Sequence, residues 1–216
     1  MLQQSIKNFI QQDLQIQYLL HLADNALILS HRNSQWCGHG PILEQDIALT
    51  NIALDQLGQA RNLYQYGALI ITEQTGIATT EDQLAYLRDT GEFKNVLMAE
   101  LPNGDWGQTV LRNFLLGSYQ FFLYQELQQT ANGQLKAIAD KSIKEITYHV
   151  RWSADWVVRL GDGTTESHAR MVKALELLWA YTGEMLEPCD YELPIIAAQS
   201  SFIKAAWEAK IAAVFA

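Results

Sequence analysis

Cysteine is scarce in this sequence, and no cluster of basic residues is present. The two cysteines, Cys37 and Cys189, form no C-x-x-C pair, so we predict no disulfide framework and expect reduced thiols in a cytoplasmic protein. The net charge is −9, from 15 basic and 24 acidic residues. A chain with this charge and no basic patch is not expected to bind nucleic acid.

Long apolar runs are also missing. The longest are far shorter than the roughly 20 residues that a membrane-spanning helix needs, so we expect no membrane association. Residues 1–15 carry scattered polar side chains and no apolar core of the kind found in signal peptides. Hydrophobic residues nevertheless make up 49% of the chain and charged residues only 18%. This composition predicts a compact globule with part of its surface covered by a partner.

The length of 216 residues suits one domain, spanning 1–216, with a sizeable core. Helical spacing of apolar residues dominates, and no stretch alternates as a strand would. The pattern predicts helices at about residues 13–30, 42 to the mid-seventies, 80–87, 106–130, 134–160, 165–187 and 200–216.

Turn residues mark the ends of these predicted helices. Thr80-x-x-Gln83 is a capping-box pattern, and Leu101–Asp105 has the composition of a turn. The predicted stops are Gly76, Asn132-Gly133, Gly161 and Pro188. Long helices with short to medium connections predict an all-α four-helix bundle with additional short and C-terminal helices.

A bundle of this kind can hold a dimetal carboxylate site. Such a site takes one Glu from each of two helices and a Glu-x-x-His pair from each of the other two. Spacing of i, i+3 puts the carboxylate and the imidazole on one helix face. The residues three before the five histidines are Tyr18, Ile28, Trp36, Ile146 and Thr165. None of them is acidic, so the sequence contains no Glu-x-x-His pair.

The nearest remnant of a ligand pair is Glu145 with His149, at i, i+4, in a stripe with Ile138, Ser142 and Trp152. Asp24, Asp46 and Asp55 also lie in apolar surroundings, and Asp55 has Gly58 where a ligand pair would have His. One interpretation is a divergent dinuclear site. The other is a set of buried polar residues with hydrogen-bonding partners among Asn51, Gln59, Arg61, Lys144 and Arg151.

We favour the second interpretation, and predict no catalytic, cofactor-binding or metal-ligating residue in this chain. The candidates for a vestigial site are Asp24, Asp55, Glu145 and His149. Cys37-Gly38-His39 supplies too few ligands for zinc. Ser30-His31 and Ser167-His168 are adjacent in the sequence and so cannot share a helix face, and no G-x-S-x-G elbow is present, which disfavours a hydrolase.

Aromatic residues are frequent on two of the predicted long helices. Some of them are expected to point outward, either onto the short helix near Tyr86 or into an interface with another subunit. The residues are Phe114, Tyr119, Phe121, Phe122, Tyr124, Trp152 and Trp156.

Several segments together resemble one family, the C-type subunits of ring-1,2-phenylacetyl-CoA epoxidase. Trp36-Cys37-Gly38-His39 and Leu57-Gly58-Gln59-Ala60-Arg61-Asn62 are specific in combination, and the resemblance covers about residues 20–216. The other matching segments are 23–32, 44–52, 54–55, 102–104, 143–149, 159–164 and 206–209.

The resemblance implies a ferritin-like fold and a structural subunit without a cofactor of its own. It implies a homologous catalytic subunit that carries a di-iron centre, a further small subunit and a separate reductase. The complex would add one oxygen atom to the aromatic ring of phenylacetyl-CoA. Members of the family carry a Gly-rich tail with His-Thr-Glu beyond the last helix, whereas this sequence stops at Ala216, which leaves the contacts of such a tail open.

Two alternatives remain beside a structural subunit. The first is a self-sufficient ferritin-like dimetal oxidase or oxygenase with divergent ligands. The second is a helical interaction protein unrelated to oxygenases. The number of metal ligands separates a structural subunit from a self-sufficient oxidase, and co-purification with a larger ferritin-like chain would exclude an unrelated interaction protein.

Overall fold

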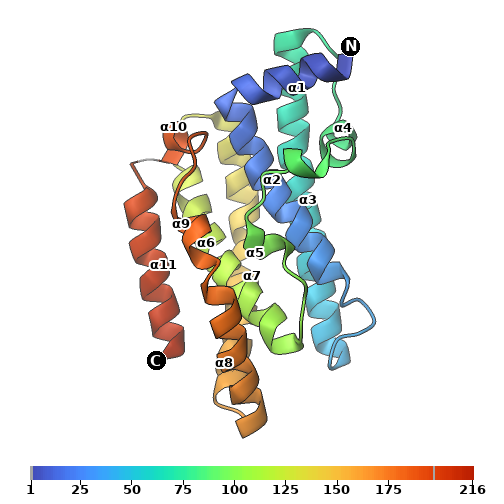
Figure 1. The fold of residues 1–216 in the computed structure, drawn as a ribbon. Helices are drawn as coiled ribbons and strands as arrows, with labels where there is room; N and C mark the ends of the chain where they lie inside the picture. The colour runs from blue at the N-terminus through green and yellow to red at the C-terminus, as the bar shows by residue number, and fades with distance from the viewer. Residues whose placement is uncertain (1, 197) are drawn as a thin grey trace.

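The computed structural model describes residues 2–196 and 198–216, and every regular element among them is helical (Figure 1). The elements are α1 (Leu2–Gln12), α2 (Leu14–Ser34), α3 (Leu43–Thr75), α4 (Glu81–Tyr86), the 3-10 turn η1 (Thr90–Glu92), α5 (Leu97–Glu100), α6 (Trp106–Leu127), α7 (Gly133–Gly161), α8 (Thr165–Trp179), α9 (Thr182–Leu186), α10 (Leu193–Ile196) and α11 (Ser200–Phe215). None of the helices in these residues is long and apolar enough to cross a membrane.

Most of the predicted helix ends are confirmed, and local chemistry explains them. The carboxylate of Asp13 accepts the backbone N–H of Ile16 at 2.9 Å and so begins α2. Gly76 adopts a left-handed conformation, with φ of 71°, and ends α3. Thr80 and Gln83 form the predicted capping box of α4. These short-range signals are legible in the sequence because both partners lie within four residues.

Three helix boundaries were predicted wrongly. The first long helix continues to Ser34 instead of Ser30, and α6 ends at Leu127 instead of Thr130. Asn132-Gly133 does not close α6: the side chain of Asn132 accepts the N–H of Leu135 at 3.0 Å, so the pair opens α7. Asparagine is as good an N-cap as it is a turn residue, and the pattern alone did not separate these roles.

The predicted helix at 165–187 is two helices, α8 and α9. The chain breaks after Trp179, whose carbonyl accepts the hydroxyl of Thr182 at 2.8 Å. A side chain that bonds the backbone in this way competes with the helical ladder. The helix α1 and the short elements η1, α5 and α10 were not predicted; the last three are too short to show a period.

The long helices α2, α3, α6 and α7 form the bundle, and their contacts fix its directions. Asp24 pairs with Tyr64 while Ser30 pairs with Ala53, so α2 and α3 are antiparallel. Between α3 and α7, Gln45 contacts Trp152 and Gln59 contacts Glu145, so these helices are antiparallel too.

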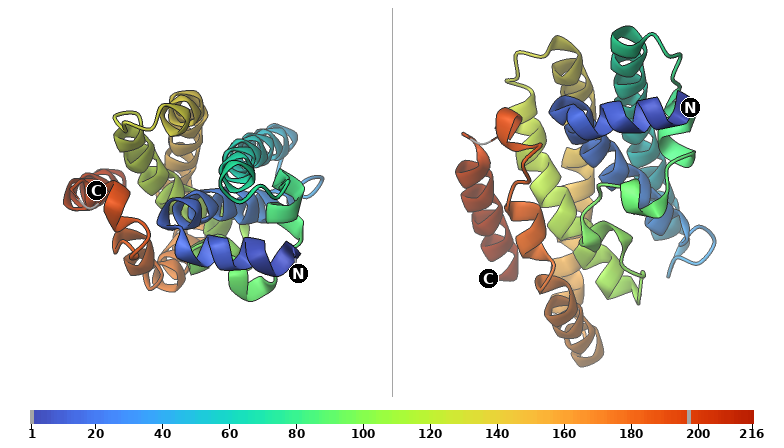
Figure 2. Two further views of the ribbon diagram at one scale, coloured as in Figure 1. Left: turned by 90° about the horizontal axis from the view of Figure 1, so that it is seen from above. Right: turned by 45° about the horizontal axis from the view of Figure 1, so that its top comes forward.

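The short loop after Leu127 makes α6 and α7 a third antiparallel pair. It follows that α3 and α6 run in the same direction and that residues 76–105 form a long crossover between them. One long crossover is the connectivity of ferritin-like bundles. The predicted all-α, ferritin-like fold with additional short and C-terminal helices is therefore confirmed (Figure 2).

Outer helices cover α6 on the side of the bundle away from α3 (Figure 1). Trp207 of α11 is 1% exposed, and its indole N–H donates to the carbonyl of Leu115 at 2.9 Å. This cover corrects the prediction of outward aromatic residues. All seven that were named on the two helices are buried or half-buried, because α6 is enclosed by α7, α8 and α11 and because Trp152 and Trp156 face α3.

Three buried amides join α2, α3 and α6. The amide nitrogen of Asn33 donates to Gln56 at 2.9 Å and to Asn113 at 2.8 Å, and the amide of Asn113 donates back to Asn33 at 2.9 Å. Asn33 is fully buried, with Gln56 and Asn113 3% and 4% exposed. Buried amides have to find partners, so this network sets the register of the three helices against one another.

We expect that replacing Asn33 by Ala will lower the free energy of unfolding by at least about 2 kcal/mol, because the side-chain oxygens of Gln56 and Asn113 each lose their donor. Urea denaturation followed by circular dichroism measures this change. Asn51→Ala, at an exposed position of α3, is the control and should change stability by less than about 0.5 kcal/mol. Equal losses in the two variants would contradict a register-setting role for the network.

Candidate functional site

Three of the four vestigial-site candidates meet between α3 and α7. The Nε2 of His149 lies 3.0 Å from the Oδ2 of Asp55, and the amide of Gln59 donates to Glu145 at 2.8 Å. His149 is 4% exposed, whereas the side chain of Asp55 is 38% exposed at the rim. The two bonds lie one turn apart along both helices, which places a short polar seam between two otherwise apolar contacts.

A tryptophan cluster adjoins this seam toward the start of α3. Gln45 accepts the indole N–H groups of both Trp152, at 2.9 Å, and Trp156, at 2.7 Å. Trp106 packs edge-on against both rings and against Trp36. Trp36, within the segment that carries the family resemblance, therefore has a packing role, as its neighbours Cys37 and His39 remain exposed.

Asp24, the fourth candidate, belongs to a different cluster. It has no exposed surface, and its carboxylate accepts both terminal nitrogens of Arg88, the hydroxyl of Tyr64 and the backbone N–H of Lys94. Burial and then the charge of Asp24 raise the pKa of Tyr64, so its hydroxyl stays a donor. Burial disfavours the charge of Arg88, but the hydrogen bond and charge of Asp24 outweigh it and raise the pKa of Arg88.

The sequence-based partners of these acids were only partly right. Gln59 does bond Glu145, but Arg61 pairs instead with Glu81 at 3.6 Å. Asp46 is not in the site: it accepts the N–H of Gly40 at 2.9 Å in the loop before α3. The other expected partners, Asn51, Lys144 and Arg151, are exposed.

These residues do not fit a pair of metal ions. The carboxylate of Asp24 is already engaged by a buried cation, and a second cation beside Arg88 would be repelled. The interior positions of α2, α3 and α6 nearest one another carry amides, which are weaker ligands than carboxylates. Across residues 2–196 and 198–216 no three His, Cys, Asp or Glu side chains are placed to share an ion.

Sequence reasoning missed Arg88, Gln45 and the amide network. Arg88 lies in the crossover, where no periodicity shows which side faces inward, and 64 positions separate it from Asp24. Gln45 had a usable signal, because Trp152 and Trp156 stand at i, i+4 and their N–H groups need a common acceptor.

Replacing Asp24 by Asn should destabilise the chain by about 3–5 kcal/mol, because Arg88 would remain buried without its counter-ion. Thermal and urea unfolding of the isolated chain measure this. The matched control is Asp155→Asn, which removes an exposed carboxylate from α7 and should change stability by less than about 0.5 kcal/mol. Similar stability of the two variants would mean that the Asp24–Arg88 pair does not hold the crossover.

Comparison with known proteins agrees with this geometry. The model of a family described as phenylacetic acid catabolic protein matches residues 3–216. The chain is also 41% identical over 198 residues to the C-type subunit of 1,2-phenylacetyl-CoA epoxidase from Escherichia coli strain K12, an alignment that covers 90% of this chain and 78% of that protein. This chain therefore belongs to the phenylacetic acid catabolic protein family.

Proposed function

We propose that this chain is a structural, non-catalytic subunit of a multicomponent oxygenase that epoxidises the aromatic ring of phenylacetyl-CoA in the cytoplasm. In this proposal a homologous catalytic subunit holds the di-iron centre, and a further small subunit and a reductase complete the complex. The present chain stabilises and positions the catalytic subunit and contributes no ligand to its iron.

The observation that carries the proposal is the state of Asp24. A carboxylate directed into a ferritin-like bundle would be a natural metal ligand, but here it is neutralised by Arg88 and bonded by Tyr64 and Lys94. The lack of any Glu-x-x-His in the sequence supports the same division of labour. The similarity to a protein named as the C-type subunit of the epoxidase supports the substrate.

The outer face of α3 supports a binding partner. Leu43, Ile47 and Leu54 are 71%, 52% and 60% exposed and recur at intervals of four and seven residues. This spacing makes one apolar stripe along the helix. Gly58 follows Leu54 by one turn, and a side chain there would meet nothing within 4 Å. The stripe and the open position at Gly58 together suit close packing against a helix of another subunit.

A rigid sister bundle can help catalysis without touching the substrate. Catalytic groups have to be held within about 0.5 Å of productive geometry. The amide network and the Asp24 cluster stiffen this chain, and a stiff α3 gives its partner a fixed surface. On this view Asp55, Glu145 and His149 contribute through folding and not through chemistry.

Replacing Leu54 by Asp should weaken binding to the catalytic subunit about tenfold or more, since a lost leucine contact and a buried charge each oppose association. The fold should be unaffected because Leu54 is exposed. Leu177→Asp on α8 is the matched control, as Leu177 is 48% exposed and lies outside the stripe. Interferometry with the purified catalytic subunit gives both affinities, and equal effects of the two variants would count against α3 as the interface.

The double variant Asp55→Asn, His149→Gln tests the structural role itself. It should retain turnover of the reconstituted complex to within about twofold, provided that it is folded and bound, because neither residue takes part in chemistry. Turnover of phenylacetyl-CoA, complex assembly and the metal content of each subunit are measured together.

Loss of turnover with assembly and partner iron intact would show that this chain takes part in the reaction. Stoichiometric iron, manganese or zinc in the isolated chain, lost when Glu145 and His149 become Ala, would favour a self-sufficient dimetal enzyme instead.

A further inference from the structure

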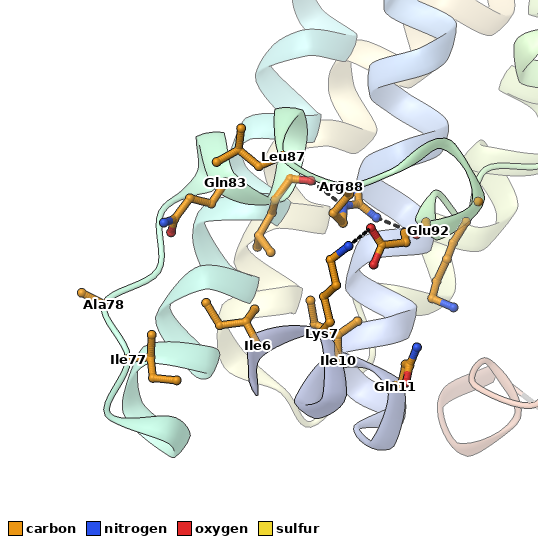
Figure 3. A pocket seen from close by; sticks show the side chains of 13 residues that line it. Ile6, Lys7, Ile10, Gln11, Ile77, Ala78, Gln83, Leu87, Arg88 and Glu92 are labelled. Atoms are coloured by element: carbon orange, nitrogen blue, oxygen red, sulfur yellow. Dashed lines mark hydrogen bonds and ion pairs between the residues drawn. The ribbon is translucent and has the colours of Figure 1, made fainter. Parts of the chain in front are cut away.

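A cavity of about 350 Å³ lies between α1 and the crossover, away from the α3–α7 seam. Five aliphatic side chains form its apolar wall: Ile6, Ile10, Ile77, Leu84 and Leu87. Figure 3 shows Ile77 and Ala78 at one end, Gln11 at the other, and Ile6, Lys7 and Ile10 of α1 between them. The cavity is thus elongated, and its volume is in the range of small-molecule sites.

Three cationic side chains also line the cavity, and two of them are neutralised. Arg88 is bonded to Asp24 and to the carbonyls of Leu84 and Glu92. The ammonium of Lys7 pairs with Glu92 at 2.8 Å and with Asp89 at 3.1 Å. These groups have no capacity left to bind a ligand's charge.

Lys94 differs from the other two cations. Its backbone N–H is bonded to Asp24, which fixes the residue in place, and its side chain is half-buried. The ammonium lies 4.9 Å from the centroid of the Tyr191 ring, and no carboxylate in the described part of the chain pairs with it. Burial, reinforced by the charge of Arg88, lowers the pKa of Lys94, as expected for an ammonium that lacks a counter-ion.

From this geometry we propose that the cavity binds a small amphipathic monoanion, a medium-chain alkyl or arylalkyl carboxylate. The carboxylate pairs with Lys94, and the apolar tail lies along Ile6 and Ile10 toward Ile77. A single uncompensated cation favours one negative charge over a phosphate or a nucleotide. The aliphatic wall favours a hydrocarbon tail over a sugar.

Three probes of equal chain length test the charge requirement: octanoate, octan-1-ol and octylammonium. We expect octanoate to bind the full chain at one saturable site, as followed by calorimetry and by chemical shifts of α1 amides. Octan-1-ol should bind at least about tenfold more weakly, because an ion pair adds more than about 1.4 kcal/mol in a partly desolvated site. Hexanoate should also bind about tenfold more weakly than octanoate, as it buries two fewer methylenes.

Lys94→Met is the decisive variant, because it keeps the aliphatic stem and removes the charge. It should weaken octanoate at least about tenfold and leave octan-1-ol unchanged. Lys210→Met, at a half-buried lysine lining a separate groove beside Phe121 and Phe122, should alter neither ligand.

The proposal is overturned if octanoate binds Lys94→Met as well as it binds the natural chain, or if octylammonium binds as tightly as octanoate, or if no saturable binding is seen below the micellar concentration. The comparison of octanoate with octylammonium uses the natural chain alone, so it remains decisive even if a variant is unstable. Because no partner subunit is needed, failure here leaves the proposed structural role untouched.

Discussion

The carboxylate of Asp24 is the constraint on which much of this structure depends. A charge with no exposed surface must be paired inside the protein. Its donors come from α2's neighbour α3, through Tyr64, and from the crossover, through Arg88 and Lys94. One side chain thus ties residues 84–94 to the bundle. With those residues in place, the crossover can support α1 on one side and lead through α5 into α6 on the other.

The remaining polar contacts in the interior follow the same logic at lower cost. The Asn33 amide network, the Gln45 acceptor for two indoles and the Asp55–His149 bond each join different long helices. Each satisfies its own buried groups, and apolar packing fills the space between them. The interior is therefore organised by pairs that need each other, which leaves the outer face of α3 as the place where apolar surface is unsatisfied.

The sequence alone predicted what depends on near neighbours. The caps at Asp13, Thr80 and Gly76, the four long helices and the seam of Glu145 with His149 all have signals within a few residues. The ferritin-like connectivity came from the resemblance. The partner of Asp24 could not be found, because 64 positions of chain intervene and the crossover carries no period to orient Arg88. The break after Trp179 and the opening role of Asn132 depended on which of two local bonds a side chain would make.

The amide network also bears on how such a bundle can change over evolutionary time. Asn33 is a donor to the oxygens of both Gln56 and Asn113. A single change of Asn33 to Glu or Asp would set a carboxylate against two carbonyl oxygens, with no proton between them. Three helices would have to change together before an acidic ligand set became stable. The interior therefore acts as a ratchet: it is easily kept by drift and is reached from a metal-binding ancestor, or left again, only through unstable intermediates.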